Sequence, residues 1–177
     1  MLRRHVYLLG FMACGKTTVG RELAQHLGCP FYDLDALIEQ QQRLSVAEIF
    51  AHHGEAAFRR MEAEALRWVA QQAAGVVATG GGTPCFADNM AFMNSHGITV
   101  HIHLPAAVLS ARLASDRAQR PLISGLTTAQ LHHYVEQTLA QRAPFYAQST
   151  HTLNAIDTPP NALAIAIANA ICNDASF

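Results

Sequence analysis

The sequence lacks the features that mark membrane, secreted and zinc-binding proteins. No apolar run approaches the roughly 20 residues needed to span a bilayer, and the run at Val6–Leu9 is short and leads into a glycine loop, which favours a strand over a signal peptide. The four cysteines include no C-x-x-C pair, and the ten histidines form no H-E-x-x-H motif. These absences exclude the common zinc motifs and a disulfide scaffold, so we expect reduced thiols in a soluble, cytoplasmic protein.

A strong charge of either sign is also missing. The chain has 12 basic and 13 acidic residues, which gives a formal net charge of -1. Net charge therefore provides no general attraction for nucleic acid or an anionic membrane, and we expect neither as a partner. With 177 residues, 50% of them hydrophobic and without an internal repeat, the sequence predicts one compact domain over residues 1–177. We expect this domain to be a monomer.

Short apolar runs alternate with longer segments of helical period, the pattern of an α/β fold with helices on both faces of a parallel sheet. Ser45 and Glu48 have capping-box spacing and predict a helix start, while Gly28 suits the left-handed position at a helix end. Strands are predicted at about 5–9, 30–34, 76–79, 99–104 and 150–154. Helices are predicted at about 16–27, 36–42, 45–53, 56–72, 86–95, 105–114, 128–143 and 161–173.

A phosphate-binding motif lies between the first predicted strand and helix. Residues 10–17 read GFMACGKT and match G-x-x-x-x-G-K-[ST]. In such a loop, backbone N–H groups and the helix N-terminus face phosphate oxygens, Lys16 reaches the β- and γ-phosphates, and the Thr17 hydroxyl can ligate Mg²⁺. The motif and its position predict binding of ATP or GTP. For Cys14, inside the loop, we favour the role of a small tolerated side chain over that of a reactive thiol.

Two carboxylates, Asp33 and Asp35, come at the end of the second predicted strand, on the edge where open parallel sheets bind ligands. Alternation along a strand would put both on one face, so that one could support Mg²⁺ through water and the other could meet a substrate hydroxyl. The alternative, that either residue only caps the following helix, stays open from the residues alone.

Further candidates follow along the chain. Arg59 and Glu62 are three residues apart on one helix face, which by itself favours a surface ion pair. Gly80–Gly82 follow the third strand and either allow a ligand to approach the backbone or form a flexible connection. Residues 115–127 lack an apolar period and contain Arg117 and Arg120, which is typical of a mobile lid that contacts phosphates on closure.

Taken in order, these motifs resemble the shikimate kinase family over nearly the full chain. The phosphate loop is followed by F-x-D-x-D, by the run Ile49–Glu62, by the triple glycine, by Arg-Pro-Leu in the lid and by Arg-Ala-Pro-x-Tyr from Arg142. The resemblance implies a three-layer P-loop fold like that of nucleoside monophosphate kinases, with a five-stranded parallel sheet of order 2-3-1-4-5 and a lid. It also implies MgATP-dependent phosphorylation of shikimate to shikimate 3-phosphate, a step of chorismate and aromatic amino acid biosynthesis.

The resemblance implies a role for each candidate. Asp35 would hold and help deprotonate the 3-hydroxyl, Arg59 and Arg142 would bind the carboxylate, and Arg120 and Lys16 would stabilise the moving phosphoryl group. The implied catalytic residues are Lys16, Asp35 and Arg120. Nucleotide binding would involve Ala13, Cys14, Gly15, Lys16, Thr17, Thr18 and Arg120. Substrate binding would involve Asp35, Arg59, Gly80, Gly81, Gly82 and Arg142. Thr17 and Asp33 would serve Mg²⁺.

Three departures from the family pattern stand out. Ala13 occupies a loop position that is usually glycine, so phosphate contacts change if that position needs unusual torsions. Pro159 and Pro160 stand where some members have an arginine for adenine, and Arg112, a candidate to flank the base, is shifted in register. Two other functions compete with the leading one: a kinase of gluconate or of an aminoshikimate-type ring, and a nucleotide-binding regulatory module without catalysis.

Overall fold

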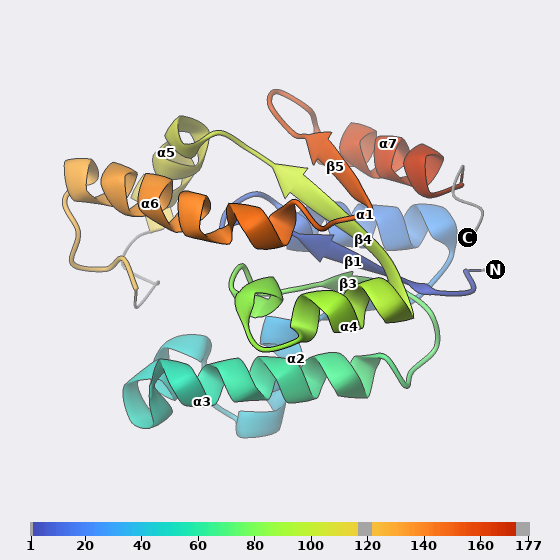
Figure 1. Cartoon of the computed structure of the whole chain (residues 1–177), viewed down its shortest axis with the longest axis horizontal. Coiled ribbons are helices and arrows are strands. Elements are labelled where there is room, and N and C mark those ends of the chain that lie inside the picture. Colours follow the sequence, from blue (N-terminus) through green and yellow to red (C-terminus); the bar gives the residue numbers. More distant parts are fainter. Residues whose placement is uncertain (1, 117–121, 173–177) are drawn as a thin grey trace.

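A five-stranded parallel sheet forms the middle layer of the molecule (Figure 1). The computed structural model describes residues 2–116 and 122–172. The strand order is β2-β3-β1-β4-β5, which confirms the order implied by the family resemblance. The strands are β1 (His5–Leu9), β2 (Phe31–Asp33), β3 (Val76–Ala78), β4 (Gly97–His103) and β5 (His151–Asn154).

The central strand explains why the sequence reads as short apolar runs. All five residues of β1 are buried, because helices cover both faces of the sheet and β1 lies between β3 and β4. Its residue Val6 is paired with Val76 of β3 and with Ile98 of β4. Strands buried on both faces need apolar side chains at every position, so periodicity of two disappears.

Seven helices and one 3₁₀ turn belong to the described residues. They are α1 (Lys16–Leu27), α2 (Leu34–Gln42), α3 (Val46–Val69), η1 (Thr83–Cys85), α4 (Asn89–His96), α5 (Ala106–Asp116), α6 (Thr128–Tyr146) and α7 (Pro160–Cys172). The break predicted between residues 53 and 56 is present as a kink in α3, where Gly54 has φ 75°. The predicted caps are confirmed too, because Gly28 adopts φ 61° and Ser45 forms a capping box with Glu48.

One predicted helix is wrong at its start. A helix was predicted from residue 86, but the chain first forms η1, with Pro84 in its first turn, and α4 begins only at Asn89. Ala87 has φ 48°, a left-handed conformation that cannot belong to a right-handed helix. The turn places Gly82, the last residue of the triple glycine, against Arg59 of α3.

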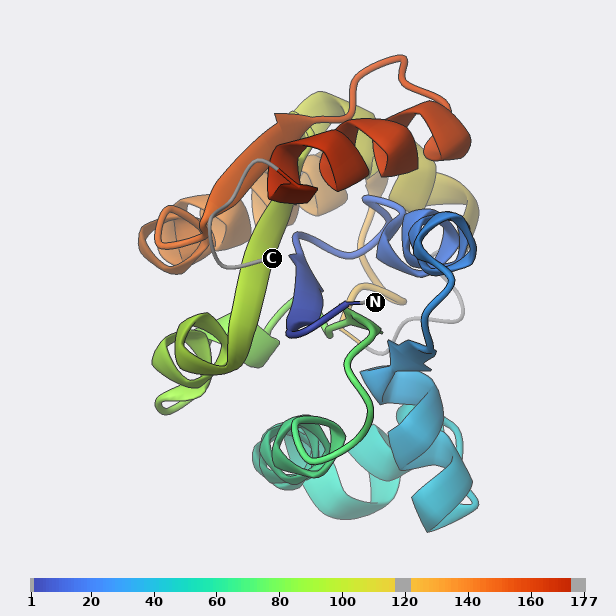
Figure 2. The same cartoon turned by 90° about the vertical axis from the view of Figure 1, so that its right-hand side faces the viewer.

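Two apolar cores hold the layers together, one on each face of the sheet. Side chains of β1 alternate between them: Val6 and Leu8 contact the core formed with α1, α5, α6 and α7, whereas Tyr7 and Leu9 contact the core formed with α2, α3 and α4. Figures 1 and 2 show α7 and α1 on the side of the sheet opposite α3 and α4. Successive side chains of β1 thus point to opposite faces of the sheet, so this one strand contributes to both cores.

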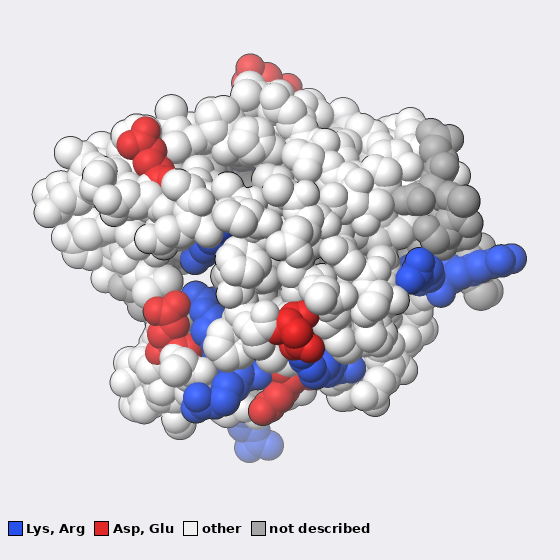
Figure 3. Space-filling view, viewed as in Figure 1, with Lys and Arg blue, Asp and Glu red and all other residues white. Residues whose placement is uncertain are grey.

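Charge is distributed without a dominant sign on the face drawn in Figure 3. Acidic and basic side chains lie beside one another over the region of α3, and the upper half of that face is mostly uncharged. Among the described residues, no helix combines the length and the apolar composition that crossing a membrane requires.

The cap at Ser45 gives a test of local stability. The Ser45 hydroxyl accepts a hydrogen bond from the backbone N–H three residues later, at the start of α3. We expect Ser45→Ala to lower the free energy of unfolding by about 1 kcal/mol, since the amide loses its acceptor. Urea denaturation measures this, with Ser45→Thr as the control that keeps the acceptor. Equal losses in both variants would contradict the assignment of the cap.

Candidate active site

The phosphate loop joins β1 to α1 in a conformation that needs glycine at both ends. Gly10 has φ 144°, and a Cβ there would come within 2.7 Å of the Ile102 carbonyl oxygen. Gly15 has φ 100° and precedes α1 without a side-chain hydrogen bond to cap that helix. The first amides of α1 are thus left for a ligand, and a helix N-terminus favours an anion.

Lys16 is held across the loop. Its Nζ donates hydrogen bonds of 2.9 Å to the carbonyl oxygens of Gly10 and Phe11, and lies 3.7 Å from the Sγ atom of Cys14. Cys14 itself is buried. Lys16 and Thr17 line a pocket of about 270 Å³ on the loop, together with Ala13, Gly15, Thr18 and the two carboxylates Asp33 and Asp35. The loop residues predicted to bind nucleotide therefore surround one hollow, except Cys14, which points into the protein.

Ala13 adopts the torsion that the family's glycine would make easy. Its φ is 63°, in the left-handed region that side chains with a Cβ adopt at a cost of about 1–2 kcal/mol. The Ala13 carbonyl accepts a hydrogen bond of 3.2 Å from Arg112 of α5. Arg112 thus contacts the phosphate loop itself.

Asp33 and Asp35 are not alternate residues of one strand, so that interpretation is wrong. Asp33 ends β2 and Asp35 lies in the first turn of α2. Asp33 Oδ1 accepts the amide of Asp35 at 3.1 Å, and Asp33 Oδ2 accepts the Thr17 hydroxyl at 2.7 Å. Asp33 therefore caps α2, as the capping alternative expected, and at the same time accepts a hydrogen bond from the phosphate loop. Its role toward Mg²⁺ stays a prediction.

Asp35 carries a buried carboxyl oxygen, Oδ1, without a hydrogen-bond partner among the described residues. Burial raises the pKa of Asp35 to about 7, and the charges of Glu62 and Asp33 add to the rise, while Lys16 opposes it in part. A carboxyl group with a pKa near neutrality can accept a proton from a substrate hydroxyl, as a general base requires.

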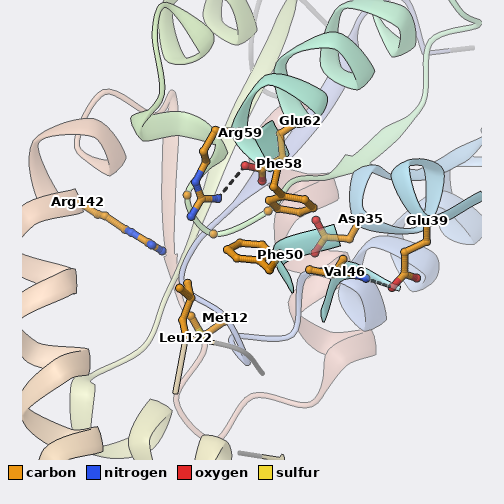
Figure 4. A pocket seen from close by; sticks show the side chains of 13 residues that line it. Met12, Asp35, Glu39, Val46, Phe50, Phe58, Arg59, Glu62, Leu122 and Arg142 are labelled. Atoms are coloured by element: carbon orange, nitrogen blue, oxygen red, sulfur yellow. Dashed lines mark hydrogen bonds and ion pairs between the residues drawn. The ribbon is translucent and has the colours of Figure 1, made fainter. Parts of the chain in front are cut away.

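A second pocket, of about 350 Å³, adjoins the first. Figure 4 shows Arg59 from α3 and Arg142 from α6 pointing into it from one side, with Asp35 on the other. Its remaining walls include the apolar side chains of Phe50 and Phe58 and the acidic side chains of Glu39 and Glu62. Both pockets are lined by Met12, Asp35, Gly80 and Gly81. Asp35 therefore stands at the junction of a phosphate pocket and a pocket with two guanidinium groups.

The ion pair of Arg59 and Glu62 is not on the surface, so the interpretation as a surface pair is wrong. Glu62 is fully buried, and Arg59 Nη1 lies 2.8 Å from Glu62 Oε2. Arg59 Nη2 lies 2.7 Å from Glu55, whose side chain is 53% exposed. Burial alone would lower the pKa of Arg59, but the charge of Glu62 and hydrogen bonds to Glu62 and Glu55 outweigh it and raise the pKa.

The triple glycine makes room for this ion pair. A Cβ at Gly80 would lie 2.0 Å from Glu62 Oε1, and a Cβ at Gly82 would lie 2.6 Å from the guanidinium carbon of Arg59. A Cβ at Gly81 would come within 3.1 Å of Arg142 Nη1. The residues alone left open a ligand contact or a flexible connection, and the family resemblance implied a contact with substrate. The structure adds that any larger side chain at Gly80 or Gly82 would displace the groups that form the pocket.

Arg142 is positioned by aromatic neighbours. Its guanidinium lies over the ring of Phe11, 5.3 Å from the ring centroid, and its Nη1 is buried without a hydrogen-bond partner in the described part of the chain. Tyr146, one turn further along α6, donates a hydrogen bond of 2.7 Å to the Gly81 carbonyl and stacks on His101. Tyr146 was not a predicted site residue, although the Arg-Ala-Pro-x-Tyr motif contains it.

Part of the predicted lid cannot be placed against the site. Arg117 and Arg120 lie outside the described residues, so the predicted contact of Arg120 with nucleotide stays a prediction. The described end of the predicted lid, from Leu122, does reach the site, since Leu122 lines the pocket beside Arg59 and Arg142.

The fold and the two adjoining pockets define a P-loop kinase of small molecules. The model of the shikimate kinase family matches residues 12–172. The chain belongs to the shikimate kinase family.

Individual relatives agree with this assignment. A shikimate kinase from Bacteroides thetaiotaomicron is 43% identical over 150 residues, which cover 85% of this chain and 86% of the relative. A crystal structure of shikimate kinase from Bacteroides thetaiotaomicron has a TM-score of 0.81, with 43% identity and 86% of each chain covered. A shikimate kinase from Acinetobacter baumannii, solved in complex with shikimate, has a TM-score of 0.91 at 32% identity, with 98% of this chain and 96% of that chain covered.

The left-handed torsion of Ala13 predicts a stabilising substitution. We expect Ala13→Gly to raise the free energy of unfolding by about 0.5–1 kcal/mol, because relief of the steric cost exceeds the entropy that glycine adds to the unfolded chain. Urea denaturation measures the change. As a control, Ala166→Gly in the exposed middle of α7 should lower stability by about 1 kcal/mol. A destabilised Ala13→Gly would show that the torsion is unstrained.

Proposed function

We propose that this protein transfers the γ-phosphoryl group of MgATP to the 3-hydroxyl of shikimate, which gives ADP and shikimate 3-phosphate for chorismate and aromatic amino acid biosynthesis. The observation that carries the proposal is the position of Asp35, which lines both the phosphate pocket and the pocket of Arg59 and Arg142. Membership of the shikimate kinase family supports the choice of substrate. It also favours shikimate over gluconate or an aminoshikimate-type ring.

The nucleotide side of the reaction belongs to the phosphate loop. We assign the phosphates to the backbone of Ala13–Thr18 and to the N-terminus of α1, where N–H groups and the helix dipole favour negative charge. Lys16 then exchanges its contacts with loop carbonyls for the β- and γ-phosphates. Arg120 completes the set as a cation from the lid that stabilises charge on the moving phosphoryl group.

The residues at the loop fit a magnesium ion. Thr17 Oγ1 and Asp33 Oδ2 lie 2.7 Å apart on the wall of the phosphate pocket, and Mg²⁺ prefers hydroxyl, carboxylate and water oxygens. Thr17 would be a direct ligand, and Asp33 would hold a bound water. When bound, the ion neutralises phosphate charge and lowers the repulsion that an attacking hydroxyl meets.

The substrate side uses the two arginines opposite Asp35. A carboxylate fits the guanidinium groups of Arg59 and Arg142, since paired N–H donors match its two oxygens. The ring would lie along Gly80–Gly82, which line the same pocket. Binding the carboxylate at one end of the pocket directs a hydroxyl at the other end toward Asp35, and this orientation supplies much of the rate enhancement in phosphoryl transfer.

Asp35 completes the reaction as the base. Its Oδ1 atom, buried and without a partner among the described residues, is available to accept the proton of the attacking hydroxyl. The proton moves from the 3-hydroxyl to Asp35, the 3-oxygen forms a bond with phosphorus, and ADP leaves. We further propose that residues 1–177 form a single monomeric, cytoplasmic domain whose lid spans about 115–127.

Replacement of Asp35 tests the proposal directly. We expect the wild-type protein to release ADP with shikimate, and Asp35→Asn to lower kcat at least about 100-fold while ATP affinity stays within about threefold, because only the base is lost. A coupled ADP assay and ATP titration measure these quantities. Glu22→Gln, an exposed carboxylate on α1, is the matched control. ADP release with gluconate or an aminoshikimate, but none with shikimate, would contradict the proposal.

The raised pKa of Asp35 predicts pH dependence in two quantities. As a base, Asp35 acts when deprotonated, so kcat/KM for shikimate should fall as pH decreases through about 7. Stability should change in the opposite sense. The folded protein holds this proton more tightly than the unfolded chain, in which the ordinary pKa of aspartate is 3.8. Ionised Asp35 therefore destabilises the fold increasingly from about pH 4 to pH 7.

Melting temperatures of wild type and Asp35→Asn across this pH range measure the second effect. We expect Asp35→Asn to gain stability relative to wild type at pH 8 and to lose that advantage at pH 4. A difference that does not vary with pH would show that the carboxyl group has an ordinary pKa.

A further inference from the structure

A chain of hydrogen-bonded polar groups runs from Arg59 through Glu62, which lines the pocket, into the protein interior. Arg59 donates to Glu62 at 2.8 Å, and Glu62 Oε1 accepts the Thr83 hydroxyl at 2.5 Å. The Thr83 carbonyl accepts the side-chain N–H of Asn89 at 2.9 Å, and Asn89 Oδ1 accepts Arg67 at 2.8 Å. Glu62, Thr83 and Asn89 are each 0% exposed. The network therefore joins α3, η1 and α4 through groups that have no access to solvent.

One of the two carboxylate oxygens of Glu62 receives its hydrogen bond from this network. An ionised carboxylate in a protein interior is stable only when its oxygens are paired or hydrogen-bonded. Arg59 serves Oε2 and Thr83 serves Oε1. Because a Cβ at Gly80 would lie only 2.0 Å from Oε1, this oxygen fills the space beside the triple glycine. Loss of the Thr83 hydroxyl would leave Oε1 without its donor and let the carboxylate turn away.

Arg59 in turn depends on Glu62 for its direction. Its other partner, Glu55, has a side chain that is 53% exposed, and exposed ion pairs are screened by water. Glu62 is buried and three residues along the same helix, so it fixes the plane of the guanidinium group. A tilt of this group disturbs a two-bond contact with a carboxylate more than a single bond, because both donors must stay aligned.

The backbone of Thr83 is held by hydrogen bonds, which fixes the position of its hydroxyl beside Glu62. Its amide donates to the Gly80 carbonyl at 3.2 Å within the turn that leads into η1. Its carbonyl is held by Asn89, which Arg67 anchors from α3. The hydroxyl is therefore attached to a backbone that is itself hydrogen-bonded on both sides, so its position relative to Glu62 is set by the fold.

We propose that Thr83 is a positioning residue for substrate recognition: acting through Glu62, it orients Arg59 for the carboxylate of the acceptor. This rests on the proposed function, in which Arg59 binds the shikimate carboxylate. Thr83 is not among the residues that line either pocket. We therefore expect Thr83 to affect the binding of the acceptor and not the rate of phosphoryl transfer.

Removal of the hydroxyl at nearly constant volume is the first test. We expect Thr83→Val to raise KM for shikimate by about fivefold to twentyfold, with kcat and KM for ATP within about twofold, since the lost hydrogen bond involves a charged partner. Thr83→Ser, which keeps the hydroxyl, should restore KM. Should Thr83→Val fail to fold, Thr83→Ala serves in its place with the same expected KM.

The control is Thr99→Val. Thr99 lies on β4, outside the site, is also 0% exposed and donates a hydrogen bond of 2.6 Å to Asn94 of α4. We expect Thr99→Val to lower the melting temperature by about as much as Thr83→Val does, without a change in KM for shikimate. A structural role for Thr83 alone would make the two variants alike, and that result would overturn the proposal.

A double-mutant cycle with Arg59→Ala separates the two levels of the argument. If Thr83 acts through Arg59, Thr83→Val should add less than twofold to the KM of Arg59→Ala. A full additional increase would overturn the role of Thr83 and leave that of Arg59 intact. An unchanged KM in Arg59→Ala alone would instead overturn the proposed carboxylate contact and, with it, the positioning role.

Discussion

Glu62 is the buried charge on which the geometry of the site depends. Its carboxylate pairs with Arg59 on one side and with Thr83 on the other, and it occupies the space that Gly80 leaves open. Its negative charge also contributes to the raised pKa of Asp35 across the pocket. One carboxylate therefore holds the guanidinium group of Arg59 and, after burial, is the next largest cause of the raised pKa of Asp35. Removing it would leave Arg59 without its buried counter-charge.

The parallel sheet brings these groups together from distant parts of the chain. The phosphate loop follows β1, Asp33 ends β2 and the triple glycine comes after β3, while β3 lies between β1 and β2. Because parallel strands end at a common edge, the three segments meet although they are far apart in sequence. The arginines arrive from outside the sheet, Arg59 on α3 and Arg142 on α6, and they face Asp35 from the opposite side of the pocket (Figure 4).

Three residues of the phosphate loop have positive φ, and one of them is an alanine. Gly10 and Gly15 accept torsions that suit glycine, whereas Ala13 adopts a left-handed φ with its Cβ present. Strained backbone near a functional site persists when the surroundings over-determine it, and here Arg112 holds the Ala13 carbonyl from α5. Ala13 therefore keeps a left-handed torsion that a glycine would adopt at lower cost.

Local chemistry by itself determined much of this protein. The phosphate motif, the apolar runs of the strands, the cap at Ser45 and the break at Gly54 are read from a few neighbouring residues, and each is present as predicted. Sequence also named both carboxylates and both arginines. It could not show where the second strand ends. Asp33 and Asp35 could both belong to that strand, or Asp33 could end it and Asp35 could lie in the following helix.

Only the tertiary structure decided how those groups behave. Arg59 and Glu62 are three residues apart, a spacing common in surface ion pairs, yet packing against η1 buries Glu62. The pKa of Asp35 rises because the carboxyl group is buried and lies near the charges of Glu62 and Asp33. The contact of Thr83 with Glu62 spans 21 residues. Burial and charge–charge distance are properties of the folded arrangement, so no local pattern carries them.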